Sequence, residues 1–278
     1  MRPRSAVRSY PGILVRSFDC RPELVLGMAG ITAVPEVVLY SEDFQSYANP
    51  LYNFVGSGNG WTGVGMIVNQ TNSIGAAGSF FSGSGAALRS LYIADSVTNS
   101  SLNQMLIYSS TNSGASSISN NGNVKISFDF NIRSNGAAGS AGISPMFDLR
   151  CPTAVASWAV TLSLGATTNR TFGNYTNGSN RVDIPGVGIT TANWYRVEMV
   201  IGDLSTANDT YNLKVWEATP AGGYNQTGSL VLDVSNLLFR ADVSYIDGFD
   251  FRTIVTNAGS VCNIDNIRVG TVAIPSGL

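Results

Sequence analysis

Residues 124–133 form the segment that most restricts how this chain can fold. Their sequence, VKISFDFNIR, alternates apolar and polar residues over all ten positions. Successive side chains of a β-strand point to opposite faces, so the alternation predicts a strand with one apolar face on a core. A helix could not gather these apolar side chains on one side, because its side chains repeat every 3.6 residues. They are Val124, Ile126, Phe128, Phe130 and Ile132.

The sequence around this segment predicts further strands separated by Gly, Ser, Asn and Thr. Short strands at such spacing are typical of a sandwich or barrel. The sequence lacks the repeat of fixed period that a propeller or solenoid would show. We therefore expect an all-β fold built as a two-sheet antiparallel sandwich. The other strands are expected at residues 37–44, 65–69, 87–94, 104–109, 143–150, 156–164, 194–201, 210–217, 231–234, 243–252 and 260–269.

Four local features refine this expectation. Residues 48–63, which include Trp61, read as a Gly-rich loop, and residues 169–179 read as a polar hairpin with an Asn-Gly turn signal. A short turn is expected near residues 234–239. Trp158 shares a strand face with apolar residues, which predicts a place in the core.

Composition excludes several classes of function. The chain has no histidine, which removes Ser-His-Asp triads, Cys-His dyads and His-ligated zinc. The net charge is −2 and no basic cluster occurs in the β region, so a nucleic-acid partner is not expected. Charged residues make up 12%, against about 25% in typical domains. Gly, Ser, Thr and Asn replace them, which suits turns, exposed strand faces and sugar-like ligands.

The three cysteines allow two interpretations. No CxxC motif occurs, which excludes a zinc ribbon and a thioredoxin-like redox site. Cys151 and Cys262 could form a disulfide in an oxidising compartment, which would leave Cys20 unpaired. Buried free thiols are at least as good an interpretation.

The first 36 residues differ from the rest of the sequence. Five arginines lie within residues 1–21, and residues 24–34 are apolar and end in small residues, as in a secretory signal. An upstream extension or a disordered arm explains the composition equally well. The apolar run is shorter than the roughly 20 residues of a membrane span. We expect residues 37–272 to form one domain and residues 273–278 a tail.

Five short motifs carry a resemblance to a known family. They are YSEDF at 40–44, NWYRVE at 193–198, YNLKVW at 211–216, IDGFDFR at 246–252 and CNIDNIRV at 262–269. Together they resemble bacterial secreted concanavalin A-like (laminin G-like) lectin/glucanase jelly-roll domains. The resemblance implies a jelly roll that is secreted or displayed at the cell surface.

The resemblance also implies a structural calcium where the first and last strands meet. Its ligands would be Glu42 or Asp43 together with Asp265 and backbone carbonyls, since carboxylate oxygens suit this ion. The alternative is that these residues only cap or solvate the strand ends.

The polar face of residues 124–133 is the best candidate for a ligand groove. Lys125, Asp129 and Arg133 lie in a row there, although alternating charges also suit a solvated face. Trp216 is a candidate stacking platform for a sugar ring, or else the edge of a second core. Trp61 is a second candidate platform, in the expected loop.

These features favour a secreted, non-catalytic β-sandwich that binds carbohydrate or a surface partner. No glutamate lies in the Glu-x-Asp-x-x-Glu pattern of laminarinase-like relatives. A polysaccharide lyase or glycoside hydrolase with an unrecognised active site is the first alternative. A structural subunit of a cell-surface or extracellular layer is the second.

Overall fold

The computed structural model describes most of the expected β region, and every regular element in it is a strand. The described residues are 37–42, 44, 61–64, 91–94, 104–109, 122–135, 143–151, 158–164, 171–176, 180–186, 188–190, 193–204, 208–218, 228–254 and 260–272. The strands are β1 (Val38–Glu42), β2 (Trp61–Val64), β3 (Leu91–Ala94), β4 (Gln104–Ser109), β5 (Gly122–Asn135), β6 (Ile143–Arg150), β7 (Trp158–Ser163), β8 (Gly173–Thr176), β9 (Asn180–Asp183), β10 (Trp194–Asp203), β11 (Thr210–Ala218), β12 (Ser229–Leu238), β13 (Gly248–Ile254) and β14 (Ser260–Thr271). In this part of the chain no helix is long and apolar enough to cross a membrane.

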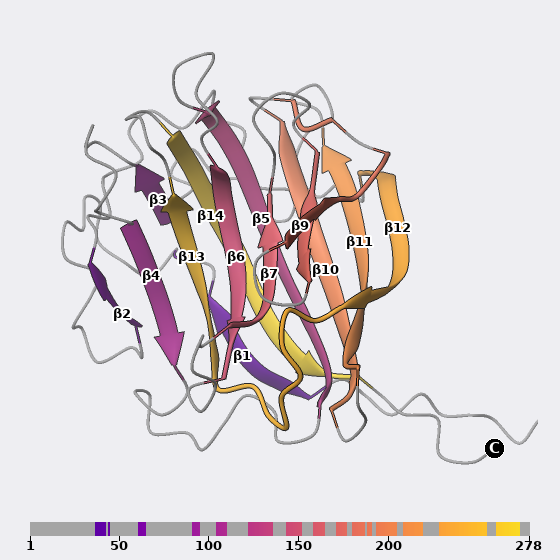
Figure 1. The fold of residues 1–278 in the computed structure, drawn as a ribbon. Coiled ribbons are helices and arrows are strands. Elements are labelled where there is room, and N and C mark those ends of the chain that lie inside the picture. The colour runs from indigo at the N-terminus through magenta and orange to yellow at the C-terminus, as the bar shows by residue number, and fades with distance from the viewer. Residues whose placement is uncertain are drawn as a thin grey trace, which may run out of the picture. The chain divides into compact units, whose positions relative to one another are not determined.

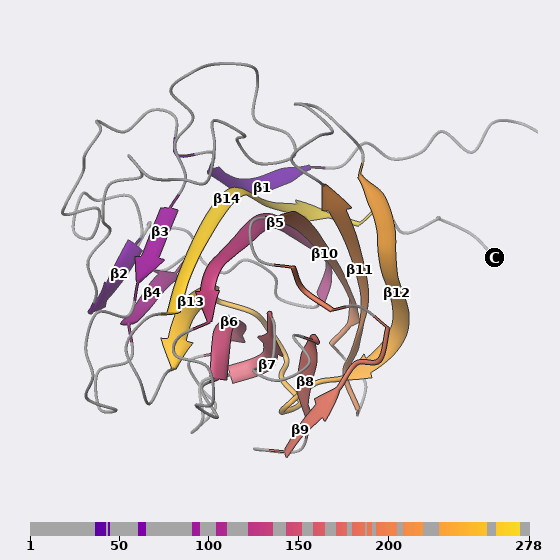
Figure 2. The ribbon, with the colours of Figure 1, turned by 90° about the horizontal axis from the view of Figure 1, so that it is seen from above.

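The strands form two antiparallel sheets. The first sheet has the order β1-β14-β5-β10-β11-β12, and β3 also pairs with β14. The second sheet has the order β2-β4-β13-β6-β7-β8-β9. Figure 1 shows the two layers, and Figure 2 shows β14, β5, β10, β11 and β12 curving around β13, β6, β7 and β8. The fold is a jelly-roll β-sandwich, as the sequence predicts.

Strand β5 lies between β14 and β10 in the first sheet. Its five predicted apolar residues are all buried, so the strand expected at residues 124–133 is confirmed and extends to Gly122–Asn135. Phe128 lies 4.7 Å from Phe147 of β6 and 5.1 Å from Phe251 of β13, measured between ring centroids. Because these partners belong to the second sheet, Phe128 joins the two layers of the sandwich.

The first and last described strands lie side by side, as the resemblance implies. Residues Tyr40 and Glu42 of β1 stand opposite Val269 and Ile267 of β14. Tyr40 packs on Phe249 of the second sheet, with 5.8 Å between ring centroids. The paired strands β1 and β14 therefore contribute to the same core.

Three local predictions for the second half of the chain are wrong. Residues 234–238 continue β12 instead of forming a turn. The strand expected at residues 243–252 is β13, which begins at Gly248. Trp158 is half-buried instead of belonging to the core. The register between β6 and β7 shifts between Leu149 and Arg150, which pairs Arg150 with Trp158. Such a shift moves a side chain to the other face of the sheet.

Other predictions lie partly outside the described residues. The strand expected at 65–69 and Cys20 fall there, and so do residues 177–179 at the tip of the predicted hairpin. The two sides of that hairpin are confirmed, since Thr176 of β8 pairs with Asn180 of β9. Cys151 and Cys262 are both buried free thiols, and burial raises the pKa of the Cys262 thiol.

A hydrogen-bond network fixes one end of the first sheet. The Tyr195 hydroxyl donates to Glu217 Oε1 at 2.6 Å and accepts from the Thr190 backbone N–H at 2.7 Å. The Asn193 side chain also donates to Glu217 Oε1, at 2.8 Å. Burial, followed by the hydrogen bond to Glu217, raises the pKa of Tyr195 to about 12.

This raised pKa predicts a loss of stability at alkaline pH. Between an unfolded-state pKa near 10 and the folded value of about 12, the unfolded chain releases the Tyr195 proton first. The contribution of the hydroxyl is therefore complete below pH 10 and falls as pH rises to 12. The difference in unfolding free energy between the protein and Tyr195→Phe should shrink by about 2–3 kcal/mol over this range. Urea titrations at each pH measure it, and parallel curves would contradict the assignment.

Candidate functional site

Each sheet has an outer face, defined here as the face turned away from the other sheet. Several predicted site residues meet on the outer face of the first sheet. Asp265, Asp129, Arg196 and Trp216 stand opposite one another in register on β14, β5, β10 and β11. The sequence predicted three of these four, but it could not place them in one row.

Asp129 is held within this row by an ion pair. Arg196 donates to its two carboxylate oxygens at 2.7 Å and 3.1 Å, and Asn266 Nδ2 donates to Oδ2 at 2.8 Å. The Asp129 side chain is fully buried, whereas that of Arg196 is 21% exposed. Charge-assisted bidentate pairs of this kind are strong, so Asp129 serves first to fix Arg196 on the sheet.

The other predicted residues divide between the two sheets. Lys125 lies on the same outer face and pairs with Glu198, with 3.7 Å between Nζ and Oε2. Trp216 is half-buried on that face. Arg133 belongs to β5, but its side chain lies outside the described residues, as does that of Trp61. Trp61 begins strand β2 of the second sheet instead of lying in a loop, so that prediction is wrong.

The predicted calcium ligands do not share one face. Glu42 stands opposite Ile267, which is buried in the core, and accepts a 2.7 Å hydrogen bond from the Phe44 N–H. Asp265 stands opposite Asp129, on the outer face. Asp43 lies outside the described residues, and among those described no three acidic or cysteine side chains form a metal-binding group. The calcium stays a prediction.

The outer face of the second sheet carries a group of polar residues that the sequence did not single out. Asp250, Asp148 and Thr161 stand opposite one another on β13, β6 and β7, and all three are fully buried. Thr161 Oγ1 donates to Asp148, and Arg150 Nη1 lies 3.3 Å from Asp250 Oδ2. Two carboxylates thus face each other across neighbouring strands, each with a donor beside it.

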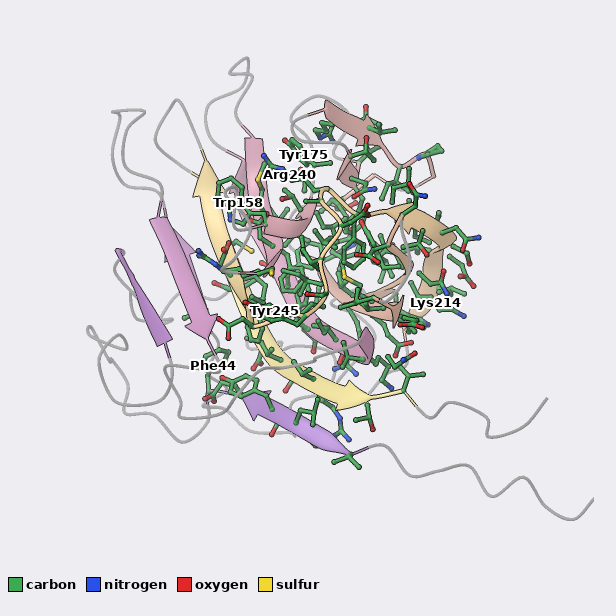
Figure 3. All side chains as sticks on the ribbon, turned by 60° about the horizontal axis from the view of Figure 1, so that its bottom comes forward. Phe44, Trp158, Tyr175, Lys214, Arg240 and Tyr245 are labelled. Carbon is green, nitrogen blue, oxygen red and sulfur yellow. The ribbon has the colours of Figure 1, made fainter. Side chains whose placement is uncertain are left out.

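Arg240 covers one side of this group. It follows β12, and its backbone N–H donates to the Ala159 carbonyl of β7 at 2.8 Å. Its guanidinium lies 4.8 Å from the centroid of the Trp158 ring and 5.9 Å from that of Tyr175. Its Nη1 also donates to Thr161 Oγ1 at 3.2 Å. Figure 3 shows Trp158, Arg240 and Tyr175 close together, coming from three different segments.

A glycine makes room for a second arginine on this face. Arg181 of β9 lies over Gly173 of β8, and a Cβ at Gly173 would collide with the Arg181 guanidinium. Arg181 also pairs with Asp183 and donates to the Thr171 carbonyl at 3.3 Å. Any larger residue at 173 must displace this guanidinium, so the glycine is part of the geometry of the face.

The sequence contains a signal for part of this group. Asp148, Thr161 and Asp250 each sit between two core residues of a strand, which places them on the opposite face. Nothing in the sequence gives the register that aligns the three. Arg240 lies in the connection after β12, where no alternation of apolar and polar residues predicts which way its side chain points.

Comparisons with known proteins find similarity to solved structures. No family model and no curated protein matches the chain. The chain is similar to an alginate lyase from Aplysia kurodai, with a TM-score of 0.45 and 11% identity over 66% of this chain and 84% of that one. It is also similar to lectin II from Ulex europaeus, with a TM-score of 0.46 and 11% identity over 84% of this chain and 98% of the lectin. A protein of unknown function from Shewanella oneidensis has a TM-score of 0.47 and 13% identity over 97% of this chain and all of its own.

The Asp129–Arg196 pair predicts a difference between two similar substitutions. Asp129→Asn leaves Arg196 without its carboxylate in a buried setting and should lower the unfolding free energy by about 1–3 kcal/mol. The matched control is Asp233→Asn. Asp233 pairs with Lys214 at 3.2 Å, but both side chains are about 45% exposed, so a change within about 0.5 kcal/mol is expected. Guanidinium unfolding midpoints measure both, and equal losses would contradict the structural role of Asp129.

Proposed function

We propose that this protein binds carbohydrate through the outer face of its second sheet. The observation that carries the proposal is the placement of Arg240 against the rings of Trp158 and Tyr175, above the buried polar residues of β6, β7 and β13. The half-buried Trp158 offers an apolar ring beside hydrogen-bond donors at fixed positions.

This combination suits the two surfaces of a sugar. The C–H groups of a pyranose ring pack on an aromatic face, and its hydroxyls take directional hydrogen bonds from nearby polar groups. A guanidinium has five donors in a rigid plane, so Arg240 can keep its bond to Thr161 and still donate to a ligand. Arg150 and Arg181 are partly exposed on the same face and add further donors.

The outer face of the first sheet is less suited to this role. Its charged side chains pair with one another along the sheet, as Lys125 does with Glu198 and Lys214 does with Asp233. Such pairs suit a solvated surface. Trp216 on this face stays a predicted platform and supplies the matched comparison for the test.

Affinity electrophoresis tests the proposal. The full chain is run through gels cast with plant, algal and bacterial polysaccharides, and at least one polymer should retard it. Trp158→Ala should weaken binding to that polymer about tenfold or more, since 1.4 kcal/mol of lost stacking corresponds to a factor of ten. Trp216→Ala should leave it unchanged.

Two results would count against the proposal or relocate the site. An absence of retardation across a broad panel would reject carbohydrate binding. Loss of retardation in Trp216→Ala alone would move the site to the first sheet. Arg240→Lys provides a variant that keeps the charge but loses the planar donor set, and it should also bind more weakly. Circular dichroism on each variant checks that the sandwich is intact.

Glycoside hydrolysis is a second candidate function, favoured by the facing carboxylates of Asp148 and Asp250. Directly opposed residues on antiparallel strands have Cβ atoms about 4.5–5.5 Å apart. Retaining glycosidases hold their two carboxyl groups about 5–5.5 Å apart, one as acid and one as nucleophile. The register of β6 and β13 places the two carboxylates opposite each other on the proposed binding face, where both side chains are fully buried.

Product release from the retarding polymer distinguishes binding from hydrolysis. If the pair is catalytic, Asp148→Asn and Asp250→Asn should each lower the rate of reducing-end formation by about a hundredfold or more while the gel retardation persists. If the parent protein binds a polymer and never cleaves it, the result supports binding and rejects hydrolysis.

A further inference from the structure

Arg240 belongs to the connection between two strands, so its position depends on what holds that connection. Residues 239–247 link β12 to β13. Phe239 and Val243 are buried in the core, whereas Arg240 reaches the outer face of the second sheet. The Arg240 N–H donates to the Ala159 carbonyl of β7 at 2.8 Å, which holds the connection to the second sheet.

Asp209 holds the same connection from the first sheet. It directly precedes β11, and its backbone carbonyl accepts from the Phe239 N–H at 2.9 Å. Its Oδ2 atom accepts from the Val243 N–H at 2.8 Å, and its own N–H donates to Asp242 Oδ1 at 3.1 Å. One residue therefore bonds to both ends of the short segment that contains Arg240.

The surroundings of the Asp209 side chain suit an acceptor better than one half of an ion pair. The residue is 1% exposed, and its Oδ1 atom has no hydrogen-bond donor among the described residues. Burial raises the pKa of Asp209, the Val243 N–H lowers it, and the carboxylates of Asp242 and Asp203 raise it. In the described part of the chain these carboxylates do not form a metal-binding group. Buried carboxylates that stabilise a fold by charge have a cation beside them, whereas this one faces other acids.

We infer that Asp209 is a positioning residue of the carbohydrate site, because its hydrogen bonds fix the segment 239–243 so that the Arg240 guanidinium lies against Trp158 (Figure 3). Asp209 acts through Arg240, since its own side chain is buried. The link to binding rests on the proposed function. The contact between Arg240 and Trp158 exists without a ligand, so the positioning can be tested separately.

A spectroscopic measurement tests the positioning in the ligand-free protein. In full chain labelled with fluorotryptophan, the ¹⁹F resonance of Trp158 is assigned by its absence from Trp158→Phe. Asp209→Ala removes the side-chain acceptor, so this resonance should shift, as it should in Arg240→Lys. Asn131→Ala is the matched control, because it removes a buried amide that donates to the Asn193 carbonyl on the first sheet at 2.7 Å. It should leave the resonance unchanged.

Gel retardation tests the consequence for binding. Asp209→Ala should weaken binding to the retarding polymer about fivefold, as expected for the loss of one hydrogen bond behind the site. Asp209→Asn keeps an acceptor oxygen at the same place and should bind at least as tightly as the parent protein. Rescue by the amide separates the acceptor role from a general loss of stability, and circular dichroism checks that each variant is folded.

The pH dependence of binding provides a second readout of the Asp209 carboxyl group. Because its pKa is raised above 3.8 in the folded protein, the uncharged form favours the closed connection. The closed connection is therefore most stable below pH 3.8 and loses stability as pH rises through the folded pKa. The affinity of the parent protein relative to Asp209→Asn should fall from about pH 4 to about pH 7. A constant ratio would overturn the assignment.

The positioning role and the carbohydrate site fail in different ways. If no polymer retards the parent protein, carbohydrate binding is rejected, and the Trp158 resonance alone decides what Asp209 does. If a polymer binds and Asp209→Ala changes neither the resonance nor the affinity, the positioning role is wrong while binding stands. An equal shift of the resonance in Asn131→Ala would also overturn the role, because it would reflect a general loss of stability.

Discussion

The burial of β5 on both of its faces is the constraint on which the rest of the structure depends. One face packs Phe128 and its apolar neighbours against the second sheet, and both backbone edges are used by β14 and β10. The other face carries Asp129 and Asn131, which are also buried. A strand in this position cannot leave its polar side chains to water, so their partners must come from adjacent strands. Arg196 and Asn193 fulfil this requirement and thereby tie β10 and its preceding loop to the centre of the sheet.

The sequence predicted the strands whose alternation is strict and missed features that depend on register. Residues 124–133 lie within β5, and residues 194–201 and 210–217 lie within β10 and β11, because each pattern has an apolar face that only a strand can bury. Trp158 fits the same rule by sequence. A register shift beside Leu149 changes its face, and no local pattern encodes that shift.

The candidate site shows the same division between local and long-range information. The polar face of β5 could be predicted as a row, but not that Arg196 would neutralise Asp129. Asp148 and Asp250 are about a hundred residues apart in sequence and meet only because β6 and β13 pair in one register. Arg240 reaches the face from a connection that is held to β7 by backbone hydrogen bonds from Arg240 and Ala241 to the Ala159 carbonyl. Such placements follow from tertiary pairing, which is the part of the fold that single-residue patterns do not describe.

The position of Arg240 has a consequence for how this fold can change. Phe239, its neighbour in the chain, is buried in the core, where its ring lies 6.0 Å from that of Tyr211. The next peptide unit passes from the interior to the outer face of the opposite sheet. A change that repacks Phe239 would therefore shift the guanidinium that lies against Trp158, and a change in the position of Arg240 would strain the core. At this junction a change in the core and a change on the outer face are coupled.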